Sequence, residues 1–243
     1  MFNRIAVVGT SWDCSYGYSS YTGETHAYTR RSRSWIAVLA HMYGIDYGCY
    51  GVPSATTVAP GSSHIGEHGA VCWQTDAHGL PALLDDADND KKANLYWMDL
   101  HQNDWKKIGR YDDTYLGTID DIKEDYTQNP DTFYGNYGRI LDQIISKCPR
   151  ALFIFSYKET ASTQAAGKAY AAAVREIAEH YGAPYINFED DAWFLNWLEK
   201  HLVQDHPTFT DYAGIAKAAD RLFAKCARNN WEYFKNFVPA ADA

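Results

Sequence analysis

Short, continuously apolar runs alternate with segments of helical periodicity along most of this chain of 243 residues. Runs that are apolar on both faces are typical of strands buried inside a parallel sheet, because strands with one wet face alternate apolar and polar residues. Repeated strand, helix and strand segments form βαβ units, so the pattern predicts an α/β fold with a doubly wound parallel sheet. The predicted strands cover residues 5–8, 46–50, 95–100, 151–155 and 184–188.

Four segments between and after these strands carry apolar residues at the spacing of a helix face. Gly44 and Gly182 follow two of these segments, and glycine is a typical helix stop. The predicted helices cover residues 34–43, 137–146, 164–180 and 211–227.

Two stretches, residues 60–92 and 106–130, fit neither pattern. The first is rich in glycine and histidine and holds an acidic run from Asp85 to Asp90, and the second is rich in tyrosine and aspartate. We interpret both as long loops or small insertions at the sheet edge, where α/β proteins keep their binding surfaces. Because the chain has no internal repeat or low-complexity linker, we expect a single domain over residues 1–243, with insertions near 60–92 and 106–130.

Charge and composition restrict the partners of the chain. Its 31 acidic and 22 basic residues give a net charge of -9, which repels phosphate backbones and anionic lipid, so we expect neither nucleic acid nor membrane as a partner. The apolar runs fall short of the roughly 20 residues of a membrane helix, and the start of the sequence lacks the pattern of a secretory signal. Five widely spaced cysteines indicate thiols in a reducing compartment. We expect a cytoplasmic or phage-associated protein.

Polar residues suited to acyl transfer follow three predicted strands and precede the last predicted helix. Ser11 follows the first strand, at the edge where the carboxyl ends of parallel strands form a ligand crevice. A serine becomes a nucleophile when a base takes its proton, and His206 is a candidate base. After the third strand, Asn103 offers an amide that stabilises an oxyanion, and the loop around Ser54 offers backbone N–H groups.

Each of these residues also has a plainer interpretation. Ser11 could cap a helix, Asn103 could form a turn, and His206 is one of nine histidines. Three other histidines, at 64, 68 and 78, suggest a metal, but a pair four residues apart binds one only on a helix. The glycines between and beside them disfavour a helix, so we expect a loop and no metal site.

The four blocks, taken together and in this order, resemble the SGNH, or GDSL-like, hydrolase family. Gly9-Thr10-Ser11 is similar to the Gly-Asp-Ser block, and the resemblance implies that Ser11 is the nucleophile. It places Ser54 at the family's oxyanion glycine, Asn103 at the asparagine of Gly-x-Asn-Asp, and His206 at the histidine of Asp-x-x-His-Pro. The implied fold is a three-layer αβα sandwich with a five-stranded parallel, flavodoxin-like sheet, and the family chemistry needs no cofactor.

The sequence departs from the family pattern beside the predicted base. Val203 stands where the family carries its aspartate, and the nearby acid is Asp205. Three arrangements follow: Asp205 orients the imidazole, a backbone carbonyl replaces it, or the enzyme works with a Ser-His dyad. Ser54 keeps its backbone N–H donor but lacks the conformational freedom of glycine.

We therefore expect a serine esterase that hydrolyses a small acyl ester through an acyl-enzyme. The 15% aromatic content and the habit of the family favour acetyl groups on a carbohydrate, so the expected partner is a small-molecule or glycan ester. The alternative is a catalytically impaired SGNH-like module that binds carbohydrate or has a structural role, and the missing aspartate motivates it. Acyl transfer to an alcohol shares the acyl-enzyme with hydrolysis.

Overall fold

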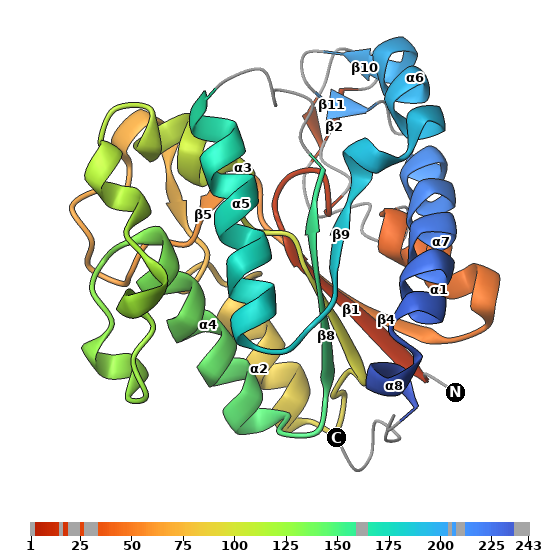
Figure 1. Cartoon of the computed structure of the whole chain (residues 1–243), viewed down its shortest axis with the longest axis horizontal. Coiled ribbons are helices and arrows are strands. Elements are labelled where there is room, and N and C mark those ends of the chain that lie inside the picture. The colour runs from red at the N-terminus through yellow and green to blue at the C-terminus, as the bar shows by residue number, and fades with distance from the viewer. Residues whose placement is uncertain are drawn as a thin grey trace.

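The computed structural model describes residues 3–14, 17–18, 25–26, 34–158, 165–203, 206–207 and 212–235. A five-stranded sheet with the order β4-β1-β7-β8-β9 forms its centre, and helices cover both faces (Figure 1). Every neighbouring pair in this sheet is parallel, which confirms the predicted α/β fold and all five predicted strands. The strands are β1 (Arg4–Gly9), β4 (Asp46–Gly51), β7 (Leu95–Met98), β8 (Leu152–Tyr157) and β9 (Tyr185–Asn187).

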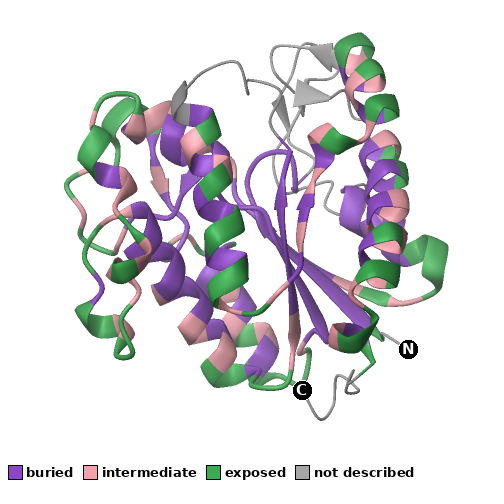
Figure 2. Ribbon diagram, in the orientation of Figure 1, coloured by how far each residue is buried: buried purple, intermediate pink, exposed green. Residues whose placement is uncertain are grey.

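Two apolar cores lie on opposite faces of the sheet, because successive side chains of a strand point to opposite faces. On β1, Ala6 and Val8 belong to one core and Ile5 and Val7 to the other. The buried strands between the two helical layers are visible in Figure 2. The first core is closed by α2 (Leu80–Asp88), α4 (Phe133–Lys147) and α5 (Ala165–His180), and the second by α1 (Trp35–Tyr43), α6 (Ala192–His201), α7 (Tyr212–Asn229) and α8 (Trp231–Phe234).

The helix ends follow the expected local chemistry. Ser34 caps α1 by accepting a hydrogen bond from the Ala37 N–H at 3.3 Å, and Gly44 ends the helix with a φ of 63°. Helix α4 begins earlier than the predicted residue 137, because Thr132 caps it by accepting the Gly135 N–H at 3.1 Å. The four predicted helices therefore exist, and side-chain caps mark the starts of α1 and α4.

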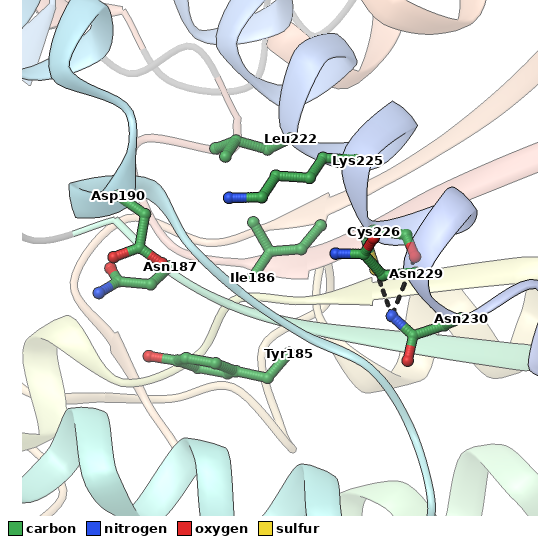
Figure 3. Close-up of a pocket in the computed structure, with 9 residues that line it drawn as sticks. All are labelled: Tyr185, Ile186, Asn187, Asp190, Leu222, Lys225, Cys226, Asn229 and Asn230. Atoms are coloured by element: carbon green, nitrogen blue, oxygen red, sulfur yellow. Dashed lines mark hydrogen bonds between the residues drawn. The ribbon is translucent and has the colours of Figure 1, made fainter.

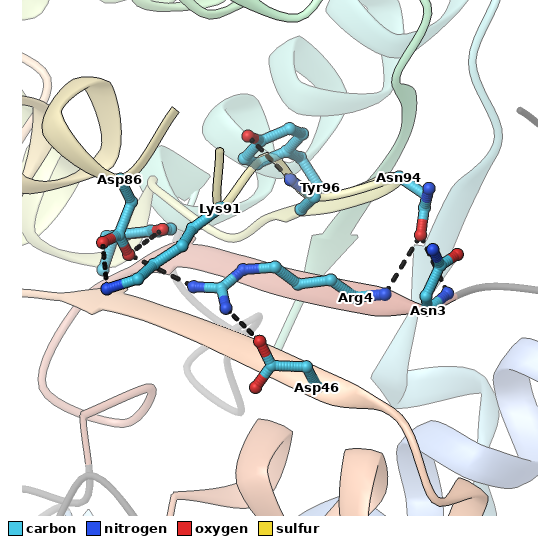
Figure 4. A network of polar contacts seen from close by, with 9 residues as sticks. Asn3, Arg4, Asp46, Asp86, Lys91, Asn94 and Tyr96 are labelled. Carbon is cyan, nitrogen blue, oxygen red and sulfur yellow. Dashed lines mark hydrogen bonds and ion pairs between the residues drawn. The ribbon is translucent and has the colours of Figure 1, made fainter. Parts of the chain in front are cut away.

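Within residues 60–92, which we interpreted as a long loop or a small insertion, residues 80–88 form helix α2, which was not predicted. A short buried stripe of Leu80, Leu83 and Ala87 holds this helix against the sheet. Its acidic run is also not simply solvated: Asp86 accepts a hydrogen bond from Arg4 (Figure 4). Asp86 also accepts a hydrogen bond from the Tyr50 hydroxyl. In the sequence, the carboxylates around this buried stripe resemble those of a solvated loop. Helix α6 was likewise not predicted.

Short elements connect the sheet and its helices. Among the helices that the structure describes, none has the length and apolarity to cross a bilayer. The short strands are β2 (Gly17–Tyr18), β3 (Thr25–His26), β5 (Ala55–Thr56), β6 (Val71–Cys72), β10 (Leu202–Val203) and β11 (His206–Pro207). The short helical turns are α3 (Gln102–Asp104), η2 (Glu67–Gly69), η3 (Trp105–Gly109), η4 (Asp113–Leu116), η5 (Ile119–Asp121), η6 (Tyr126–Gln128) and η7 (Phe188–Asp190).

Candidate active site

The sheet order brings three of the predicted site residues to one edge. Strand β1 lies between β4 and β7, and Val8 pairs with Tyr50 on one side and with Met98 on the other. Ser11, Ser54 and Asn103 follow these three strands at their carboxyl ends. Strand β1, which leads to Ser11, therefore lies between the strands that lead to Ser54 and Asn103. All three residues lie at the edge where α/β sheets bind ligands.

Ser11 lies in a tight turn at residues 10–14, which we call the Ser11 turn. The Asp13 carboxylate accepts the Thr10 N–H at 2.7 Å, and the Asp13 N–H donates to the Thr10 carbonyl at 3.1 Å. A Cβ at Gly9 would come within 2.0 Å of Asp13 Oδ2, so this turn requires glycine there. Because Ser34 caps α1, Ser11 caps no helix in the described part of the chain.

Ser54 has the left-handed backbone conformation that usually selects glycine. Its φ is 62°, and its carbonyl accepts the Val71 N–H at 3.1 Å where β5 begins to pair with β6. A left-handed conformation costs a non-glycine residue about 1–2 kcal/mol. Ser54 thus adopts a backbone conformation that glycine favours, and the family resemblance places a glycine at this position.

A hydrogen-bonded carboxylate fixes the Asn103 turn (residues 101–104) to the loop that follows Ser54. Asp104 Oδ1 accepts the Thr57 N–H and the Thr57 hydroxyl, both at 2.8 Å, and the Tyr115 hydroxyl at 2.9 Å. Burial raises the pKa of Asp104 to about 6, although these hydrogen bonds oppose the shift. Within the described residues, the buried Asn103 Nδ2 has no hydrogen-bond partner, so this amide is available as a donor.

The predicted base belongs to a small hairpin. Strand β11 pairs antiparallel with β10, with Val203 opposite His206. It also contacts β2, which follows the Ser11 turn along the chain (Figure 1). The backbone at His206 therefore lies beside the segment downstream of Ser11. The His206 side chain and all of Asp205 lie outside the described residues.

A buried ion cluster behind the Ser11 turn was not predicted. Lys158 directly follows β8 and is 0% exposed, its Nζ lies 2.8 Å from Asp13 Oδ1, and it also pairs with Asp99. Burial and the charge of Lys158 hold the pKa of His101 well below its ordinary range, so this imidazole is neutral. In the sequence, a single lysine after an apolar run is typical of a solvated strand end. Only the tertiary structure shows that Lys158 is buried beside Asp13 and Asp99.

Two of the remaining histidines, His64 and His68, each contact a neighbouring side chain. His64 is within 2.8 Å of Glu67, and His68 stacks on Tyr111 with ring centroids 3.7 Å apart. Among the described residues, no group of three or more potential ligands could hold a metal ion. Figure 3 shows a polar hollow between β9 and α7, lined by Tyr185 and Lys225 among others, and no predicted site residue lines it.

Comparison with known proteins identifies the family. Residues 5–219 match the model of the GDSL-like lipase and acylhydrolase family. The chain belongs to this family. Membership confirms the resemblance drawn from the four sequence blocks and the expectation of an SGNH-type esterase. No curated protein matches the chain.

Solved structures with the same fold include members of this family and carbohydrate esterases. A protein from Bacteroides ovatus described as a GDSL-like lipase is 14% identical, with a TM-score of 0.60, and the match covers 93% of this chain and 99% of that one. A family 2 carbohydrate esterase from Corynascus thermopiles is 15% identical, with a TM-score of 0.60, covering 93% and 67%. One from Clostridium thermocellum, in complex with cellohexaose, is 16% identical, with a TM-score of 0.53, covering 95% and 65%. At these identities the similarity shows the fold alone.

Proposed function

We propose that the protein is a serine esterase that removes a small acyl group from its substrate through an acyl-enzyme. His206 takes the proton of the Ser11 hydroxyl, and Ser11 Oγ attacks the ester carbonyl. The backbone N–H groups of Ser11 and Ser54 and the Asn103 amide hold the oxyanion of the tetrahedral intermediate. The alcohol leaves with the proton from His206, and an activated water then hydrolyses the acyl-enzyme.

One observation carries this proposal: the buried Asn103 Nδ2, which has no hydrogen-bond partner among the residues that the structure describes, lies at the sheet edge that also carries Ser11 and Ser54. A buried donor without a partner costs free energy in the resting protein. An amide held there by the bonds of Asp104 needs no reorganisation when a negative charge develops on the substrate oxygen. This arrangement favours the transition state over the ground state.

Asp205 is our candidate for the acid that orients His206. The family position of this acid is occupied by Val203, whose backbone pairs with that of His206 in the hairpin. Loss of an orienting acid from a serine triad slows catalysis by about 10⁴-fold. We therefore expect Asp205→Asn to lower kcat by orders of magnitude, whereas a dyad or a carbonyl-supported histidine predicts an unchanged kcat.

We further propose an acetylated carbohydrate as the substrate. Two of the three structural neighbours named above are carbohydrate esterases, and one of them was solved with cellohexaose. The high aromatic content of the chain supports the same class, because aromatic rings pack against the apolar faces of sugars. Acetate release from acetylated cello-oligosaccharides should therefore exceed hydrolysis of a long-chain p-nitrophenyl ester at equal concentration. The reverse preference would contradict this substrate class.

The test of the proposed reaction compares the wild type with Ser11→Ala. The wild type should hydrolyse p-nitrophenyl acetate and react covalently with a fluorophosphonate probe, and Ser11→Ala should lose at least about 10³-fold in kcat and all labelling. A folded wild type with no Ser11-dependent turnover and no labelling would overturn the esterase proposal. If that protein still bound cellohexaose, the result would instead support a carbohydrate-binding module.

A further inference from the structure

A completely buried lysine lies behind the proposed nucleophile. Lys158 follows β8, and its side chain is 0% exposed. Its ammonium lies 4.8 Å from the centroid of the Trp35 ring and 5.5 Å from that of Phe188, so the surroundings are largely apolar. Two carboxylates, Asp13 and Asp99, pair with it, and their side chains are 0% and 1% exposed. We call these three residues the Lys158 cluster.

Through Asp13, the Lys158 cluster is hydrogen-bonded to the Ser11 turn. Asp13 Oδ1 accepts from Lys158 and from Trp35 Nε1, each at 2.8 Å, and Oδ2 accepts the Thr10 N–H at 2.7 Å. Thr10 and Asp13 are also joined by a backbone hydrogen bond across Ser11 and Trp12. The Asp13 side chain thus holds Thr10 and Asp13 together on either side of Ser11 and Trp12, and Lys158 holds the Asp13 carboxylate.

Through Asp99, the same lysine reaches the strand that leads to the oxyanion donor. The Asp99 N–H donates to the Val8 carbonyl at 2.7 Å, and the Ser156 hydroxyl donates to the Asp99 carboxylate. Four residues after Asp99 comes Asn103. One ammonium therefore joins the ends of three strands: β8, which precedes it, β1, which leads to Ser11, and β7, which leads to Asn103.

Stability alone does not account for such a cluster. Taking ions out of water is unfavourable, and a protein with well-packed apolar residues in place of a buried ion pair is often as stable or more so. Burial raises the pKa of Asp99 well above its ordinary value, in keeping with that cost. An ammonium between two carboxylates makes directional hydrogen bonds with fixed geometry, and an apolar side chain makes none.

We infer that Lys158 is a positioning residue for the nucleophile: it holds Asp13 against the Thr10 N–H and so sets the orientation of Ser11 relative to Asn103. The inference rests on the proposed role of Ser11. A displacement of about 1 Å at a reacting group costs up to about 10²-fold in rate. Loss of the Lys158 contact should therefore lower reactivity at Ser11 while substrate binding remains.

The experiment compares Lys158→Met with a matched control, Arg4→Met. Arg4 is also a buried cation, with a side chain 11% exposed, and it pairs with Asp46 and Asp86 at the opposite end of β1 (Figure 4). Both variants remove a buried cation and should lower the urea midpoint of unfolding. The rate of fluorophosphonate labelling and kcat for p-nitrophenyl acetate should fall about 10- to 100-fold in Lys158→Met alone, with KM unchanged.

A second variant keeps the test decisive where Lys158→Met does not fold. Lys158→Met combined with Asp13→Asn leaves only Asp99, which takes up a proton when its partner is lost, so no unpaired charge stays buried. This double variant should fold and label slowly. A folded Lys158 variant that labels at the wild-type rate would overturn the inference while the esterase proposal stands. A wild type that does not label at Ser11 would overturn the esterase proposal and the inference with it.

Discussion

Replacing Asp104 by asparagine should change how the stability of the protein depends on pH. Asp104 is the last residue of the Asn103 turn and is fully buried, and burial raises its pKa from the ordinary value of 3.8 to about 6. The folded protein therefore binds a proton more tightly at this site than the unfolded chain does. Stability gained from that proton is present below pH 3.8 and is lost as pH rises through about 6.

The magnitude follows from the two pKa values. The change from 3.8 to about 6 corresponds to about 3 kcal/mol between the protonated and ionised forms. The asparagine side chain of the variant would keep one acceptor oxygen for the Thr57 N–H and would not titrate. The stability of Asp104→Asn relative to the wild type should therefore rise by about 2 kcal/mol between pH 4 and pH 7, because the unfolded chain is already partly ionised at this position at pH 4.

Urea unfolding of both proteins at pH 4, 5, 6 and 7 measures this difference. All other titrating groups are common to both proteins, so their contributions cancel when one curve is subtracted from the other. The difference should rise between pH 4 and pH 6 and then level off. A difference that is constant over the whole range would show that Asp104 titrates normally, and would refute the argument from burial.

Three further substitutions test individual contacts. Asn103→Ala should lower kcat for p-nitrophenyl acetate by about 10²–10³-fold with little change in KM, and an unchanged kcat would exclude its amide from the oxyanion site. Ser54→Gly should retain activity and stabilise the protein by about 0.5–1 kcal/mol in urea unfolding. The reason is that relief of the left-handed backbone strain at Ser54 exceeds the entropic cost of glycine. A loss of stability would contradict this. Gly9→Ala should lower the melting temperature and slow labelling, since its Cβ would meet Asp13 at 2.0 Å; wild-type values for both would disprove that close contact.

The strands could be predicted because each strand of a parallel sheet that is buried on both faces consists of an uninterrupted run of apolar residues. Helix α2 could not, because its buried residues are few and the carboxylates around them resemble a solvated loop, although Asp86 pairs with Arg4. The start of α4 depends on a single cap, Thr132, which cannot be recognised from the spacing of apolar residues.

The position of candidate residues that follow strand ends could be predicted in the same way, because topology brings those ends to one edge. Ser11, Ser54 and Asn103 are such residues, and the structure places them there. Lys158 could not be predicted, since its burial depends on Asp13, 145 positions away along the chain. His206 and Asp205 remain predictions, as do the roles of the other site residues.

The central claim is that a base near the end of the chain activates a serine near its beginning. Mass spectrometry of the protein after reaction with a fluorophosphonate, for the wild type and for His206→Ala, tests it most directly. We predict an adduct on Ser11 in the wild type and labelling slower by at least about 10³-fold in the folded variant. An adduct on another residue, or equal labelling rates in the two proteins, would contradict the account.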